Sequence, residues 1–155
     1  MELTVLVTGA AGFIGYHTAE RLLAEGCRVV GIDDLNPYYD PGLKRSRLER
    51  LCKYDRFAFA EATIAELGAL EALFRSEAIS HVVHLAAQAG VRYGLERPQA
   101  YVDANVTGFL NVLECCRRFG VAHLVFASSS SVYGANASMP HRTSDATDHP
   151  VSLYA

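Results

Sequence analysis

The chain has 155 residues, half of them hydrophobic, with a formal net charge of −3 and a pI near 6.0. This length and composition favour one folded globular domain and exclude a disordered or collagen-like chain. The charge pattern has no basic runs, which excludes an electrostatic footprint for nucleic acid, and no apolar run approaches the roughly 20 residues needed to cross a bilayer.

Short β-branched runs alternate with helical patterns along the sequence. The expected strands are residues 3–8, 27–33, 57–60, 81–87 and 123–129, and the fourth is apolar enough to predict burial on both faces. The expected helices are residues 13–24, 44–51, 65–75 and 98–119, with Gly26 and Gly120 as stop signals. A polar segment follows without a regular element until Val151, where Tyr154 lies at the expected start of another helix.

This alternation predicts βαβ units and a parallel sheet. The expected fold class is α/β, a doubly wound parallel sheet of the Rossmann type with five strands in the order 3-2-1-4-5. A complete sheet of this kind has a sixth strand, and no segment is left to supply it. We therefore expect residues 1–155 to form one incomplete dinucleotide-binding domain.

Cysteine and histidine spacing gives no sign of a disulfide frame or a metal site. The four cysteines match neither a zinc ribbon nor a CxxC motif, and the six histidines show no metal-ligand spacing. The absence of a basic leader with an apolar run agrees with an unexported protein. These features predict reduced cysteines, a cytoplasmic protein without a membrane segment, and no metal.

The segment TGAAGFIG joins the first expected strand to the first expected helix. Gly9, Gly12 and Gly15 have the spacing that permits a sharp turn, close approach of a pyrophosphate and close packing of helix on strand. The helix N-terminus would face the phosphates with unpaired amides. A tight turn that binds nothing is the alternative, but the strand-turn-helix context favours a dinucleotide.

Asp33 ends the second expected strand, where a carboxylate can accept hydrogen bonds from the adenosine ribose. A 2′-phosphate would meet this negative charge, so NAD is favoured over NADP. The alternative of a helix cap or a solvated loop acid applies better to Asp34.

A run of serines in FASSSSVYG ends the fifth expected strand, and Tyr154 follows later. Serines at the carboxyl end of a parallel strand lie in the crevice where α/β sheets bind ligands. They could also simply end the strand by competing for backbone hydrogen bonds. The serine run taken by itself favours this second interpretation, and both stay open.

Together, the glycine turn, Asp33, the serine run and Tyr154 resemble the first half of an extended short-chain dehydrogenase/reductase of the nucleotide-sugar epimerase/dehydratase family. The resemblance extends over essentially the whole chain. Three segments are similar to the bacterial UDP-glucuronate 4-epimerases: IDDLNPYYDPGLKRSRL, HLAAQAGVRYGLERPQAYVDANVTGFLNVLE and FASSSSVYG.

The resemblance implies that Tyr154 is the catalytic acid/base of a YxxxK motif and that Ser129 polarises the sugar hydroxyl. The motif's lysine would fall beyond Ala155, which implies a chain cut inside the catalytic helix and lacking the sugar-nucleotide-binding domain. The implied parent enzyme interconverts UDP-glucuronate and UDP-galacturonate through a 4-keto intermediate with recycled NAD, and this piece alone is expected to be inactive. A homo-oligomer is also expected.

The resemblance implies two further sets of site residues. The cofactor set comprises Gly9, Ala11, Gly12, Phe13, Ile14, Asp33, Asp34, Asn36, Thr63, Ile64, Leu85, Ala86, Ala87, Gln88 and Asn105. The substrate set comprises Arg92, Ser130 and Ser131.

Two positions depart from the family pattern: Thr63 replaces a usual aspartate that contacts adenine, and Gly94 replaces a common serine. Ser130 and Ser131 stand where the family's dehydratases have an Asp-Glu pair, which disfavours dehydratase chemistry. Three alternatives stay open: a stand-alone NAD-binding or regulatory module, a UDP-glucose 4-epimerase and a UDP-glucuronate decarboxylase.

Overall fold

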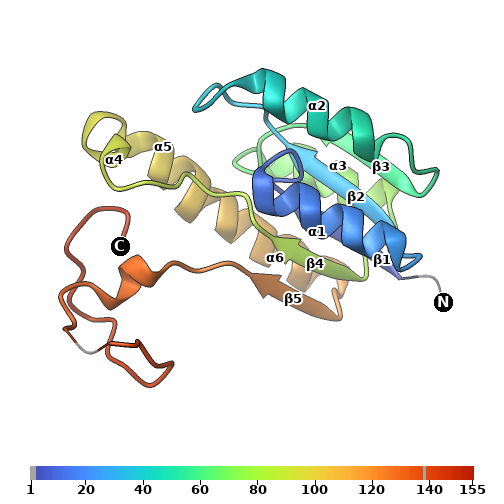
Figure 1. Ribbon diagram of the computed structural model, residues 1–155. Coiled ribbons are helices and arrows are strands. Elements are labelled where there is room, and N and C mark those ends of the chain that lie inside the picture. Colours follow the sequence, from blue (N-terminus) through green and yellow to red (C-terminus); the bar gives the residue numbers. More distant parts are fainter. Residues whose placement is uncertain (1–2, 138) are drawn as a thin grey trace.

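The computed structural model describes residues 3–137 and 139–155. Its centre is a five-stranded sheet in the order β3-β2-β1-β4-β5, with every neighbouring pair parallel. The strands are β1 (Thr4–Thr8), β2 (Arg28–Asp33), β3 (Phe57–Glu61), β4 (His81–His84) and β5 (His123–Phe126). The predicted fold class and strand order are confirmed (Figure 1).

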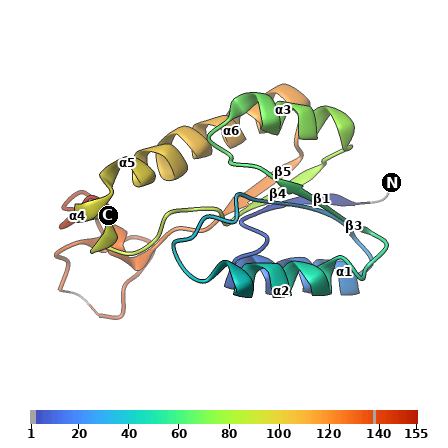
Figure 2. The same cartoon turned by 90° about the horizontal axis from the view of Figure 1, so that it is seen from above.

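Two helical layers cover the sheet. The helices α1 (Phe13–Ala24) and α2 (Pro41–Leu51) lie on one face, and α3 (Leu67–Ser76) and α6 (Phe109–Phe119) lie on the other (Figure 2). The central strand β1 alternates between two hydrophobic clusters, with Val5 and Val7 packed toward the first and Leu6 toward the second. All five β1 residues are buried, because both faces of this strand are covered.

Local capping chemistry explains where α2 begins. α1 has the bounds that the periodicity predicts, whereas α2 begins at Pro41, three residues before the predicted start. The Asp40 carboxylate accepts a hydrogen bond of 2.8 Å from Gly42 N, and Pro41 occupies the first helical position. An N-cap followed by proline is a strong start signal, which the prediction from periodicity had passed over.

The fourth and fifth strands are shorter than predicted. β4 ends at His84 rather than residue 87, because Leu85 N and Ala86 N both donate to the Thr8 hydroxyl at 3.0 Å. β5 ends at Phe126, and its residues are exposed or half-buried at the sheet edge. The prediction that β4 is buried on both faces is wrong, since burial alternates along it.

The predicted long helix is continuous from Pro98 to Phe119 but not uniform. It consists of α5 (Pro98–Tyr101), a π-helical segment η1 (Val102–Gly108) and α6, and Gly120 ends it with φ +67°. A short helix, α4 (Tyr93–Glu96), precedes it. Single π-helical turns are frequent at functional sites, and this one carries Asn105.

The segment after β5 lies beside α4 and α5 (Figure 1). Its one helical element in the described residues is the 3₁₀ turn η2 (Ser130–Tyr133). The helix expected to begin near Val151 is absent, and Tyr154 lies in irregular structure. Five residues can form only one i→i+4 hydrogen bond, which does not offset the cost of nucleating a helix.

Within residues 3–137 and 139–155, no helix combines the length and the apolar character needed to span a bilayer. The same residues contain no cluster of His, Cys, Asp or Glu able to hold a metal ion.

Candidate functional site

The glycine turn joins β1 to α1 at the carboxyl edge of the sheet. Gly9 has φ +68°, and a Cβ atom on it would lie 2.9 Å from Ala86 N. A Cβ atom on Gly15 would lie 2.0 Å from Gly9 O, so helix and turn touch at this point. Both positions therefore require glycine, and the unpaired amides of the α1 N-terminus open beside the turn.

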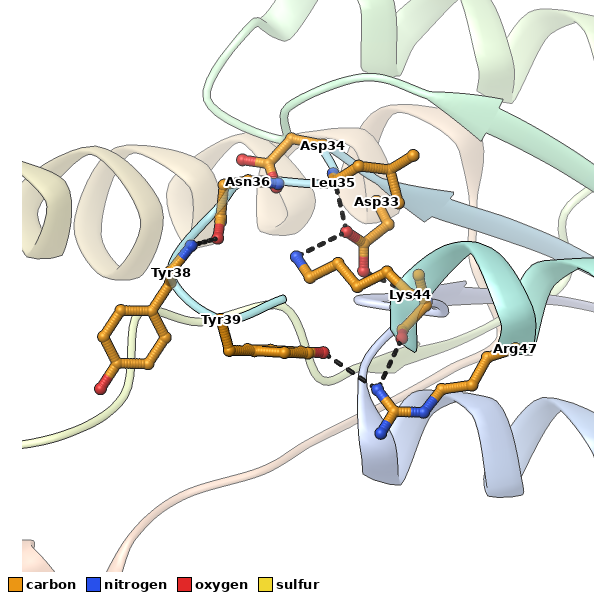
Figure 3. A network of polar contacts seen from close by, with 9 residues as sticks. Asp33, Asp34, Leu35, Asn36, Tyr38, Tyr39, Lys44 and Arg47 are labelled. Atoms are coloured by element: carbon orange, nitrogen blue, oxygen red, sulfur yellow. Dashed lines mark hydrogen bonds and ion pairs between the residues drawn. The ribbon is translucent and has the colours of Figure 1, made fainter. Parts of the chain in front are cut away.

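Asp33 lies next to this turn, at the end of β2, and its carboxylate is buried. Oδ2 accepts from Ala11 N at 3.1 Å, and Oδ1 accepts from Leu35 N at 2.9 Å and from Lys44 Nζ at 3.1 Å. Figure 3 shows Lys44 reaching from α2 toward this carboxylate. The group predicted to bind the adenosine ribose is therefore a buried Asp33–Lys44 ion pair rather than an unpaired carboxylate.

Sequence reasoning missed Lys44. It stands near the start of α2, where a cation opposes the helix dipole, and that unfavourable position is the sequence signal that could have identified it. The buried ammonium of Lys44 needs a local anion, and Asp33 is that anion.

Aromatic and cationic side chains form the rim above the ion pair. Arg47 donates to Ala11 O and to the Tyr39 hydroxyl, both at 3.1 Å (Figure 3). Its guanidinium lies 5.9 Å from the ring centroids of both Phe13 and Tyr39, and Lys44 Nζ lies 5.3 Å from the Tyr39 ring. These contacts connect α2 to the glycine turn.

A cleft runs along the carboxyl edge of the sheet from the glycine turn, and we refer to it as the cofactor cleft. Eleven of the residues predicted to bind the cofactor line it: Gly9, Gly12, Asp33, Asp34, Asn36, Thr63, Ile64, Leu85, Ala86, Ala87 and Gln88. Tyr38, Tyr39 and Lys44 also line it. Residues from the ends of β1, β2, β3 and β4 thus meet in one place, as ligand sites in doubly wound sheets do.

The remaining predicted cofactor residues lie elsewhere. Ala11 contributes its backbone to Asp33, whereas Phe13 and Ile14 are exposed on α1 and do not line the cleft. Asn105 lies behind the cleft wall, where its amide bonds Gln88 N at 2.8 Å and Gln88 O at 2.9 Å. Asn105 therefore holds the strand-end loop in place.

The edge of the cofactor cleft near β3 is built by Thr63 and Ile64. The Thr63 hydroxyl accepts from Ala65 N at 3.2 Å, and Ile64 is buried against Gly108 of the π-helical segment. Asn111 clamps the same loop by donating to Ile64 O and Ala65 O at 2.9 Å. The two predicted cofactor residues Thr63 and Ile64 are thus adjacent in a loop that Asn111 holds in place.

A second pocket, which we call the catalytic pocket, brings Ser129 and Tyr154 together. Its lining comprises His84, Leu85, Ala86, Ala87, Asn105, Phe109, Phe126, Ala127, Ser128, Ser129, Val132 and Tyr154. Leu85, Ala86 and Ala87 line both this pocket and the cofactor cleft, so one stretch of backbone separates the two. The structure thereby unites the two predicted catalytic residues beside the candidate cofactor site.

The three predicted substrate residues do not line either pocket. Arg92 is exposed before α4, and Ser130 and Ser131 lie in η2. The Ser129 hydroxyl accepts from Ser131 N at 3.2 Å and so caps that turn. The serine run begins after β5 has ended; Ser129 caps the next turn and also lines the catalytic pocket, and its role in ligand binding stays a prediction.

Tyr101 supports Tyr154 from behind. Their rings meet edge to face with centroids 5.9 Å apart, and the Tyr101 hydroxyl donates to the carbonyl oxygens of Ala89 and Gly90. Burial is the main cause that raises the pKa of Tyr101. Gly94 packs against this ring, and a Cβ atom at this position would touch two ring carbons at 3.4 Å.

With this geometry established, comparison with known proteins identifies the family. The model of the NAD dependent epimerase/dehydratase family matches residues 5–155. The chain belongs to that family. It is 49% identical over 153 residues to Protein CapI of Staphylococcus aureus, covering 99% of this chain and 46% of that protein. It is also 49% identical over 154 residues to UDP-glucuronate 4-epimerase 4 of Arabidopsis thaliana, covering 99% and 35%.

Solved structures agree with the family. The fold matches UDP-glucuronic acid 4-epimerase from Bacillus cereus, crystallised with UDP-glucuronic acid and NAD, at a TM-score of 0.86 and 34% identity. That match covers 98% of this chain and 48% of the other. This family member thus spans about half the length, or less, of the relatives it matches.

Proposed function

We propose that this chain is the NAD-binding part of a nucleotide-sugar 4-epimerase that interconverts UDP-glucuronate and UDP-galacturonate through a 4-keto intermediate. One observation carries the proposal: Ser129 and Tyr154 open into a pocket that shares its wall with the cleft of the glycine turn and Asp33. The bound cofactor and the acid/base groups would then lie on either side of residues 85–87, close to one another.

The residues of the cofactor cleft fit NAD. The turn at Gly9 and Gly15 leaves no room for a Cβ atom and presents helix amides to a pyrophosphate. A carboxylate has about four acceptor positions, and Asp33 already fills three of them with Ala11 N, Leu35 N and Lys44 Nζ. Asp33 would therefore accept from one ribose hydroxyl, and Lys44 would donate to the other.

Bound NAD⁺ supplies a hydride acceptor that later returns the hydride. Tyr154, as tyrosinate, takes the proton of the sugar 4-hydroxyl, and the Ser129 hydroxyl hydrogen-bonds the same oxygen. A phenol with a pKa near 10 needs a neighbouring cation to ionise at neutral pH. The lysine implied by the family resemblance would supply it.

The choice of UDP-glucuronate rests on relatives. The proteins of similar sequence include several named UDP-glucuronate 4-epimerases, and the structural neighbours also include UDP-glucose 4-epimerases. Homo-oligomerisation and a cytoplasmic location belong to the same proposal. We also propose that the 155-residue chain by itself lacks useful epimerase activity. The sugar-nucleotide-binding domain implied by the resemblance would position the substrate, and such positioning can account for roughly 7 to 11 kcal/mol of an activation barrier.

Calorimetric titration of the chain with NAD⁺ tests the cofactor part of the proposal. We expect saturable one-site binding with NADP⁺ weaker than NAD⁺, and no heat of binding to NAD⁺ would refute it. An epimerase assay on the parent enzyme, with NAD⁺ bound, then compares UDP-glucuronate with UDP-glucose. Faster conversion of UDP-glucuronate is expected, and equal or faster conversion of UDP-glucose would remove the substrate assignment but not the cofactor assignment.

A further inference from the structure

A buried imidazole, that of His84, lines the catalytic pocket and has no part in the chemistry proposed above. His84 is the last residue of β4 and pairs in register with Thr8, the last residue of β1. Its ring stacks on Phe109 with an interplanar angle of 8° and a centroid distance of 5.0 Å. Its Nδ1 atom lies 2.8 Å from the Thr8 hydroxyl oxygen.

The hydrogen bonds around Thr8 determine which nitrogen of His84 carries the proton. The Thr8 hydroxyl already accepts from Leu85 N and Ala86 N, each at 3.0 Å. A hydroxyl has two lone pairs and one hydrogen, so its hydrogen is the only group left for His84. Nδ1 must then be an unprotonated acceptor, and the neutral ring carries its hydrogen on Nε2.

The Thr8 hydroxyl also determines the path of the backbone that separates the two pockets. Because Thr8 takes the amides of Leu85 and Ala86, the chain leaves the sheet at His84 and forms the stretch 85–87 that lines both pockets. This stretch packs closely against the glycine turn, since a Cβ atom on Gly9 would lie 2.9 Å from Ala86 N. Loss of the Thr8–His84 hydrogen bond would therefore change the shape of both the cofactor cleft and the catalytic pocket.

We propose that His84, as the neutral Nε2–H tautomer accepting from Thr8, is a positioning residue that holds the backbone of residues 85–87 for NAD binding. This inference rests on the proposed NAD site. In this proposal His84 acts through Thr8 and the two amides rather than on the reacting atoms.

Protonation of His84 would disturb this arrangement. An Nδ1–H would approach an oxygen that already accepts two hydrogen bonds, so one wall amide would have to leave. The described polar and aromatic groups that contact His84 or line its pocket are Thr8 from β1, Asn105 and Phe109 from the long helix, Phe126 at the end of β5, Ser128 and Ser129 after β5, and Tyr154. None is a carboxylate that would favour the charged ring, and burial lowers the pKa of His84 to about 4.

Matched substitutions separate hydrogen bonding from packing. His84→Asn keeps an acceptor at the same number of bonds as Nδ1, whereas His84→Gln displaces it and His84→Leu removes it. Thr8→Ser keeps the hydroxyl, and Thr8→Val removes it while keeping the volume. We expect His84→Leu, His84→Gln and Thr8→Val to weaken NAD⁺ binding about tenfold, and His84→Asn and Thr8→Ser to stay within about threefold.

A direct readout is independent of these affinities: long-range ¹⁵N–¹H NMR of the wild-type chain at pH 7 reports the imidazole tautomer. We expect protonated Nε2 and bare Nδ1, and a proton on Nδ1 would overturn the proposal. Equal NAD⁺ affinities for Thr8→Ser and Thr8→Val, and equal affinities for the three His84 variants, would overturn it too. If Thr8→Val, His84→Leu or His84→Gln fails to fold, the NAD⁺ affinities of Thr8→Ser and His84→Asn and the tautomer still decide the outcome. A wild-type chain that binds no NAD⁺ would refute the proposed function, whereas the tautomer would still test the hydrogen-bond arrangement.

Discussion

Lys44 Nζ lies 3.1 Å from Asp33 Oδ1, and the two side chains are only 6% and 5% exposed. This pair joins α2 to the end of β2 at the point where the adenosine ribose is expected. Each partner offsets the charge of the other, so we expect the proposed preference for NAD over NADP to depend on both residues and not on Asp33 alone.

Breaking this pair from either side has different consequences. Lys44→Met leaves a buried uncompensated carboxylate and should cost about 3 to 5 kcal/mol of unfolding free energy and weaken NADP⁺ binding more than NAD⁺ binding. Asp33→Asn frees the cation and should shift the preference toward NADP⁺ by about tenfold. Urea unfolding and calorimetry measure both effects. The double variant is the control, and a loss of stability equal to the sum of the single losses would contradict the coupling.

Thr63 is a position where the family resemblance implies an aspartate. Its hydroxyl lines the cofactor cleft and already accepts from Ala65 N. Thr63→Asp would supply a charged acceptor for the adenine amino group and should strengthen NAD⁺ binding about threefold to tenfold. Thr63→Val removes the acceptor and is the matched control. Calorimetry that ranks Val tighter than Asp would refute a polar contact at this position.

Gly15→Ala should prevent normal packing of α1 on the turn. The new Cβ atom would lie 2.0 Å from Gly9 O, and both are backbone-fixed positions that cannot move apart without shifting the helix. We expect a loss of more than about 3 kcal/mol in unfolding free energy and loss of NAD⁺ binding. Gly68→Ala in α3 is the control, since its Cβ atom meets nothing within 4 Å and should stabilise the helix by up to about 1 kcal/mol.

Burial of His84 predicts a pH dependence of stability. Its pKa is about 4 in the folded chain against an ordinary value of 6.5, so between these values the unfolded chain binds more protons. Stability is therefore complete above about pH 6.5 and falls by about 3 kcal/mol as the pH drops to about 4. Urea unfolding at several pH values measures the slope. His84→Asn should flatten this part of the profile, and an unchanged slope would contradict the assignment.

Exposed apolar side chains predict self-association of the chain. Val106 and Leu110 on the long helix are 62% and 57% exposed, and Val125 and Phe126 of the edge strand are 49% and 54% exposed. Apolar surface and an open strand edge both favour pairing with another copy. Sedimentation velocity should show dimers or larger species. The variant Val106→Lys/Leu110→Lys should reduce them, whereas a wild-type monomer at high concentration would oppose the prediction.

Local pattern was sufficient for much of the fold. The periodicities of residues 3–33 predicted β1, α1 and β2 nearly as observed, because period and glycine punctuation are properties of neighbouring residues. Alternation of strands and helices led to the order 3-2-1-4-5, since right-handed crossovers leave few topologies. The glycine turn and Asp33 were predictable for the same reason: each follows directly from a strand end.

Tertiary structure decided the features that depend on partners far away in the sequence. β4 ends at His84 because Thr8, 76 residues earlier, takes the next two amides, and no local pattern contains that information. The pairing of Lys44 with Asp33 and the support of Tyr154 by Tyr101 arise in the same way. The sequence by itself determined the order of the strands and the chemistry available at their ends. Only the folded chain decided which of those groups meet, because hydrogen bonds and ring contacts depend on distances in space rather than on separation along the chain.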